Sequence, residues 1–106
     1  MGNGFESEHW NNEEGNPAGG CSYGTGFTIS WQNGPLGRDE ERVYPNGAFV
    51  EDVVAAVKDR MQFYQDSKFA SKLNAQCIAH LEAFLILQEQ RTQQREDRGV
   101  EGTHSV

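Results

Sequence analysis

The fold of this 106-residue chain is decided by residues 49–88, FVEDVVAAVKDRMQFYQDSKFASKLNAQCIAHLEAFLILQ. Large apolar side chains recur there at spacings of three and four, with charged residues between them, which is the pattern of amphipathic helices. The pattern breaks at residues 65–68 and resumes after Ser71, a residue type that favours helix N-caps. It therefore predicts two helices, residues 47–66 and 71–98, with Gly99 following the second helix as a C-cap glycine.

The short connection between these segments makes the two helices an antiparallel hairpin. Within a single hairpin, each apolar stripe is covered on one side only. We therefore expect a homo-oligomer with a helical core, either a dimer or a larger ring such as a hexamer. The stripes consist of Phe49, Val50, Val53, Val54, Val57, Met61 and Tyr64 in the first helix, and of Leu73, Cys77, Ile78, Leu81, Phe84, Leu85 and Gln88 in the second.

The N-terminal part favours a small antiparallel sheet. Residues 27–32, FTISWQ, alternate large apolar with polar side chains, the period of a half-buried strand, and Asn33-Gly34-Pro35 ends it. A weaker run at residues 42–44 could pair back on this strand, which places the sheet within residues 21–45. Residues 1–20 are rich in Gly, Asn and Glu without apolar periodicity, so we expect a disordered acidic tail there. The predicted class is α+β, with one domain over residues 21–104.

Composition excludes several classes of function. The net charge of −7 argues against binding to a DNA or RNA polymer, which needs clustered Lys and Arg. No segment has the length of a membrane span, and the N-terminus lacks the basic start and apolar run of a secretory signal. The two cysteines, Cys21 and Cys77, do not make a disulfide framework. We expect a soluble cytoplasmic protein in which an anionic ligand would need a local arginine pocket.

Arginines near the end of the second helix could form such a pocket. Arg91, Arg95 and Arg98 stand at i, i+4 and i+7, on one face, and two planar guanidinium groups could clamp a diphosphate. The alternative is that basic residues complement the helix dipole and pair with the neighbouring acidic residues, Glu89, Glu96 and Asp97.

Two other residues are candidates for ligand contacts. Tyr64 ends the first stripe, where its ring could stack on a purine or instead fill the core. Asn74 could read the edge of a base or ribose, or serve only in the first turn of its helix. Cys77, His80 and Glu82 make too few ligands for a metal site. No nucleophile, phosphate loop or catalytic acid pair is recognisable, so we predict no catalytic residue, metal or cofactor.

A long motif, R-T-x-x-R-x-x-R-G-V-E-G-T-H, occupies residues 91–104. Together with residues 29–36, 46–53, 74–75 and 80–83, this motif resembles small phage proteins of the Thoeris anti-defence type, relatives of the anti-CBASS sponges. The resemblance covers about residues 26–104. It implies a sponge that sequesters, without cleaving them, the cyclic ADP-ribose isomers made by bacterial Thoeris TIR enzymes, in the cytoplasm of the host bacterium.

The resemblance also implies roles for four residues. The family's ligand-binding aromatic falls on Tyr64, its asparagine on Asn74, and its two late arginines on Arg91 and Arg95. They would stack on adenine, hydrogen-bond the base or ribose, and neutralise the pyrophosphate. About 25 Å of helix separates Asn74 from Arg91, so we expect the pocket to cross a subunit interface. Residues 71–73 read Ser-Lys-Leu where relatives often have Cys-Arg-Glu, so the preferred ring isomer is left open.

Two alternatives stay open. The protein could be a sponge for the cyclic di- or trinucleotides of CBASS signalling alone. It could also be a helical hairpin that blocks a protein partner and uses its arginines only as helix-end charges. An enzyme that degrades the signal is the least favoured reading of this sequence.

Overall fold

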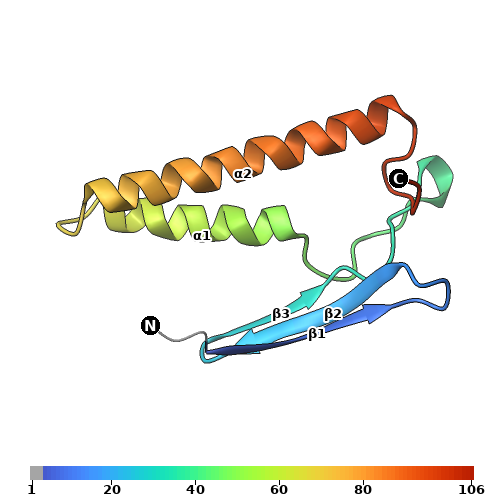
Figure 1. The fold of residues 1–106 in the computed structure, drawn as a ribbon, viewed down its shortest axis with the longest axis horizontal. Coiled ribbons are helices and arrows are strands. Elements are labelled where there is room, and N and C mark those ends of the chain that lie inside the picture. Colours follow the sequence, from blue (N-terminus) through green and yellow to red (C-terminus); the bar gives the residue numbers. More distant parts are fainter. Residues whose placement is uncertain (1–3) are drawn as a thin grey trace. The chain divides into compact units, whose positions relative to one another are not determined.

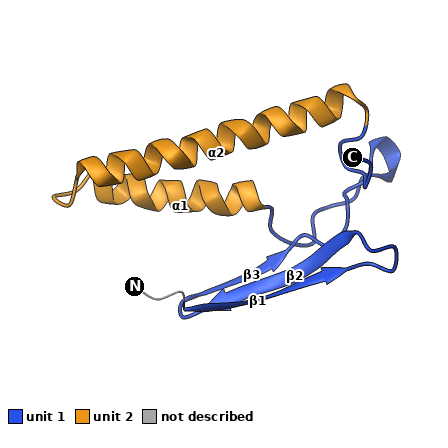
Figure 2. Cartoon of the chain, viewed as in Figure 1, with its two compact units in different colours: residues 1–49, 100–106 blue, residues 50–99 orange. Residues whose placement is uncertain are grey.

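The computed structural model describes residues 4–106 and has an α+β fold, a three-stranded antiparallel sheet followed by two helices (Figure 1). The predicted fold class is thereby confirmed. The chain divides into two compact units (Figure 2). The first holds the sheet, the described residues up to Phe49 and the C-terminal segment Val100–Val106, and the second is Val50–Gly99.

The sheet consists of β1 (Phe5–Asn11), β2 (Pro17–Gly24) and β3 (Phe27–Trp31), in the order β1-β2-β3. On one face, small residues of β2 lie between residues of its two neighbouring strands. Ser22 is buried there, accepts a hydrogen bond of 2.9 Å from Trp31 Nε1 and lies 2.7 Å from Ser7 Oγ. The three rows of this face are Phe5–Gly24–Phe27, Ser7–Ser22–Ile29 and His9–Gly20–Trp31.

The prediction of disorder over residues 1–20 is wrong where the structure forms β1 and the first half of β2. The first three residues of that segment lie outside the described residues. The glycine-rich composition suggested disorder, but here glycine allows the backbones of β1 and β2 to approach closely. A Cβ on Gly20 would lie 2.3 Å from the Glu8 carbonyl oxygen. The turn between β1 and β2 is formed by residues within the turn itself. The Asn12 side-chain oxygen accepts from the backbone N–H groups of Glu14 and Asn16, and Gly15 has φ +81°.

The expected strand at residues 42–44 does not form. A short 3₁₀ turn, Asp39–Glu41, precedes it, and Tyr44 is 93% exposed. The outer side of β3 is instead occupied by Ala48, which exchanges backbone hydrogen bonds with Ser30 and Gln32. Asn46 holds this approach through hydrogen bonds with residues 32–33, so side-chain amides of the loop take the place of a paired strand.

The helices are α1 (Val50–Gln65) and α2 (Lys72–Asp97), close to the predicted ranges of 47–66 and 71–98. The predicted N-cap is confirmed, since Ser71 Oγ accepts from the Asn74 N–H at 3.0 Å. Gly99 follows the helix with φ +73°, as expected for a C-cap glycine. The side-chain amide of Gln65 spans the connecting turn. Its oxygen accepts from the Ser71 backbone N–H and its nitrogen donates to the Ser71 carbonyl, both at 3.0 Å.

The two helices pack antiparallel within their unit, with Lys58 of α1 3.5 Å from Glu82 of α2. Ile78 on α2 is the one large apolar side chain of the described residues that is buried. Many others stay exposed, among them Phe63, Leu73, Ile86 and Leu87. The homo-oligomer that would cover them stays a prediction. Neither helix has a stretch long and apolar enough to cross a membrane within the described chain.

Candidate functional site

The last turns of α1 carry a cluster of two aromatic rings and an arginine, which we call the aromatic end (Arg60, Phe63 and Tyr64). The two ring centroids lie 6.0 Å apart at 61°, edge to face. The guanidinium carbon of Arg60 lies 4.9 Å from both centroids, and Arg60 Nε donates to the Tyr64 hydroxyl at 3.1 Å. Tyr64 is 39% exposed. This candidate residue therefore lies on the surface of a single protomer.

Asn74 lies on the other side of the turn, in the first turn of α2, and is half-buried. Its backbone N–H is held by the Ser71 cap, and its side-chain nitrogen donates to the Phe69 carbonyl at 3.1 Å. Both contacts fit the structural interpretation of this residue. The side-chain oxygen makes no hydrogen bond to another described residue, so it can accept one from a ligand.

Arg91 and Arg95 lie in the last two turns of α2 and, four residues apart, share one face. Arg91 is exposed, and Arg95 is half-buried. Arg98 is the C-cap residue, whose N–H reaches the Gln94 carbonyl. Gln93 and Asp97 hydrogen-bond each other at 3.0 Å. Two guanidinium groups on one helix face suit a diphosphate, which can accept hydrogen bonds from both.

These candidates fall into two groups at opposite ends of the hairpin. Tyr64 and Asn74 border the turn, whereas Arg91 and Arg95 lie some 25 to 30 Å farther along α2 at 1.5 Å per residue. The antiparallel pairing of Lys58 with Glu82 puts the start of α1 opposite about residue 90, so α2 runs past α1 at this end (Figure 1). One protomer does not bring all four residues to one small ligand.

The last part of the motif, residues 100–103, is fixed within the sheet-containing unit. Glu101 forms a two-point ion pair with Arg42 at 2.8 and 3.1 Å, and its carbonyl accepts from Arg38 at 2.9 Å. Gly102 accepts from the Gly37 N–H, and a Cβ on Gly102 would lie 2.4 Å from the Gly37 carbonyl oxygen. These motif residues therefore have structural roles, which sequence spacing did not reveal because the partners are about 60 residues away.

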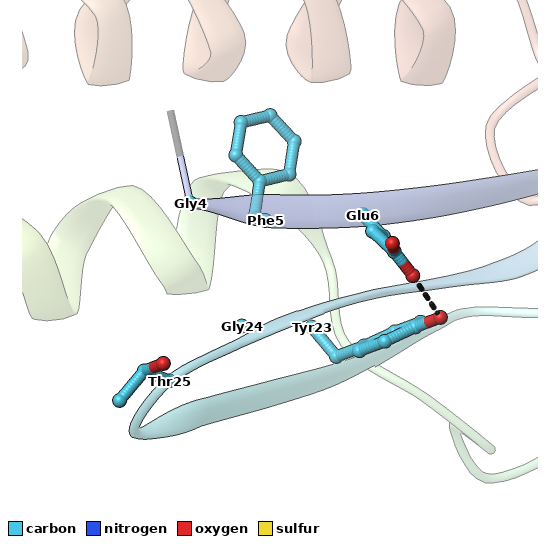
Figure 3. A pocket seen from close by; sticks show the side chains of 6 residues that line it. All are labelled: Gly4, Phe5, Glu6, Tyr23, Gly24 and Thr25. Carbon is cyan, nitrogen blue, oxygen red and sulfur yellow. Dashed lines mark hydrogen bonds between the residues drawn. The ribbon is translucent and has the colours of Figure 1, made fainter. Parts of the chain in front are cut away.

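A separate open pocket of about 510 Å³ lies on the sheet, lined by Gly4, Phe5, Glu6, Tyr23, Gly24 and Thr25. The Tyr23 hydroxyl donates to Glu6 at 2.6 Å, and Phe5 points to the other side of the sheet (Figure 3). That hydrogen bond, with the charge of Glu6, raises the pKa of Tyr23 above its ordinary value of 10.0. None of the four candidate residues lines this pocket.

Arg60 and Phe63 are the residues of the aromatic end that sequence reasoning missed. The signal was present, since Arg60, Phe63 and Tyr64 stand at i, i+3 and i+4 and must share a helix face. With respect to a metal site, no three His, Cys, Asp or Glu side chains of residues 4–106 lie close enough together to hold a metal ion.

No protein-family model matches the chain. A curated protein, "Thoeris anti-defense 1" of Bacillus phage SBSphiJ7, is 42% identical to it over 77 residues. This chain belongs to the Thoeris anti-defence family. The match takes in 73% of the chain and 51% of the relative, so the chain spans about half the length of the family member that it matches. Membership agrees with the resemblance stated from the sequence, and the ligand-binding roles of the four candidate residues rest on that resemblance and stay predictions.

Proposed function

We propose that this protein counteracts Thoeris immunity by binding and sequestering a cyclic ADP-ribose isomer, without degrading it, in the cytoplasm of a bacterial host. The name of the phage relative supports the anti-defence role. The ligand class is supported by the chemistry of the two ends: an exposed aromatic with a free amide oxygen nearby suits a base and ribose, and two arginines suit a pyrophosphate.

One observation carries the mechanism: the base-binding and phosphate-binding candidates lie at opposite ends of one hairpin. In the proposed complex, the turn end of one protomer meets the arginines of another, so that the pocket forms between copies of the chain. The exposed apolar side chains Leu73, Ile86 and Leu87 on α2 are available for such an association. A monomer mass by sedimentation at micromolar concentration would contradict this arrangement.

Calorimetry with the two cyclic ADP-ribose isomers tests the ligand. We expect the unmodified protein to bind one of them and Arg91→Ala to lose about tenfold or more in affinity, because a charge-assisted hydrogen bond to phosphate is lost. Lys58→Gln is the matched control, since it also removes one positive charge but lies on α1 in a surface ion pair. If neither isomer produces a heat of binding with the unmodified protein, the proposal is overturned.

Two further outcomes separate the rival functions. Heat denaturation of the complex should release intact ligand from a sponge and altered ligand from an enzyme. An Arg91→Ala variant that keeps its anti-defence activity in infected cells would favour a hairpin that blocks a protein partner instead.

A further inference from the structure

Arg60 has an unusual setting for an exposed arginine. Its guanidinium carbon lies over the Phe63 and Tyr64 rings, 4.9 Å from each centroid, and its Nε–H donates to the Tyr64 hydroxyl. A guanidinium group that lies over aromatic rings keeps its other N–H donors for further partners. The two ring contacts and the hydrogen bond to the hydroxyl together restrain the position of this cation.

The charge of Arg60 is also not neutralised by a carboxylate of the described chain. Its terminal nitrogens have no hydrogen-bond or ion-pair partner in residues 4–106. Lys58, two residues earlier, is paired with Glu82, and Arg42 is paired with Glu101. In a chain with net charge −7, an exposed arginine that is oriented by aromatic rings and lacks an acidic partner is a ready receptor for an anion.

We propose that Arg60 is a further ligand-binding residue, which holds a phosphate of the nucleotide whose base stacks on Tyr64. The inference rests on the proposed function and deepens it. Tyr64 is 39% exposed, so a flat base could stack on it, and the phosphate of the same nucleotide would reach the remaining N–H donors of the Arg60 guanidinium. Arg60 thereby adds a cation from the aromatic end to those that Arg91 and Arg95 bring from the other end of a hairpin.

Calorimetry on full-length Arg60→Gln, Arg60→Lys and the control Lys58→Gln tests this assignment with the cyclic ADP-ribose isomer that the unmodified protein binds. We expect Arg60→Gln to lose about tenfold or more in affinity. Arg60→Lys should fall between, because lysine keeps the charge but lacks the planar fork. Lys58→Gln should stay within about twofold, since its charge is already paired on the surface.

A phosphate-free probe separates contact with the anion from support of the Tyr64 ring. Binding of adenosine, followed by the chemical shifts of the aromatic side chains, should be the same in Arg60→Gln and the unmodified protein. An equal loss for adenosine and the cyclic isomer would mean that Arg60 only positions Tyr64, which overturns the inference.

Binding by the unmodified protein distinguishes a failure of the proposed function from a failure of the role of Arg60. If the unmodified protein binds neither isomer, the proposed function is overturned, and this inference with it. If the unmodified protein binds and Arg60→Gln binds equally well, the inference alone is overturned.

Discussion

Arginine side chains in this chain differ in what already holds them, and this decides which of them a ligand can use. Arg42 is held by Glu101 through two hydrogen bonds, and Arg38 donates to a backbone carbonyl. Arg60 is oriented by two aromatic rings, and Arg91 is exposed with no hydrogen bond or ion pair to another described residue. Residue type alone does not separate these settings, because each depends on neighbours in space.

Tyr23 offers a test at the residue scale that is independent of any ligand. Glu6 raises its pKa, so the protonated phenol is favoured in the folded protein above pH 10.0, the ordinary value. Ultraviolet titration of unmodified protein should show one late-ionising tyrosine that Glu6→Gln shifts to lower pH. The contribution of the Tyr23–Glu6 contact to the stability of the fold is complete below pH 10.0, the ordinary pKa of tyrosine. This contribution is lost as the pH rises through the raised pKa of Tyr23 in the folded protein. A titration unchanged by Glu6→Gln would contradict the Tyr23–Glu6 contact.

At the scale of the elements, the helices and β3 follow from local signals, whereas β1 and β2 do not. The Ser71 cap, the Gly99 C-cap and the three-and-four spacing of apolar residues each act within a few residues of where they stand. The first two strands depend on pairing between β1 and β2, in which glycines allow close approach of the backbones. Glycine-rich composition therefore predicted disorder where the chain forms a hairpin.

Gly20→Ala tests the pairing of these strands. The new methyl group would lie 2.3 Å from the Glu8 carbonyl oxygen, so β1 must move and its hydrogen bonds with β2 are lost. We expect destabilisation by about 2 kcal/mol or more, measured by denaturant unfolding, with faster amide exchange in β1. Gly4→Ala is the matched control because nothing lies within 4 Å of its Cβ position. Equal stability of the two variants would contradict the described register.

At the scale of the whole molecule, the proposed binding site requires more than one copy of the chain. The length of α2 beyond the start of α1 carries Arg91 and Arg95 away from the turn that holds Tyr64 and Asn74. Because an α-helix rises by a fixed distance of about 1.5 Å per residue, the two arginines stay far from the turn within one protomer. Assembly would then complete the pocket as well as cover exposed apolar side chains.

Mixing two weakened variants tests this arrangement directly. Tyr64→Ala and Arg91→Ala should each lose about tenfold or more in affinity for the cyclic isomer, because every pocket lacks one component. In co-assembled protein, a mixed pair contains one intact pocket, so random dimers should regain about a quarter of the unmodified binding sites by calorimetry. A mixture that binds no more ligand than either variant alone would show that both residues act in the same protomer.

The sequence by itself determined the helical hairpin, its cap residues, the strand at residues 27–31 and the family motif with its arginines. Each is set by spacing or by residue type within a short window. Only the tertiary structure decided the strands at residues 5–11 and 17–24, the Arg42–Glu101 pair and the stacked Arg60. The first two join residues distant in sequence. The third depends on the side-chain conformation that places a guanidinium against two rings, which helical spacing permits but does not fix.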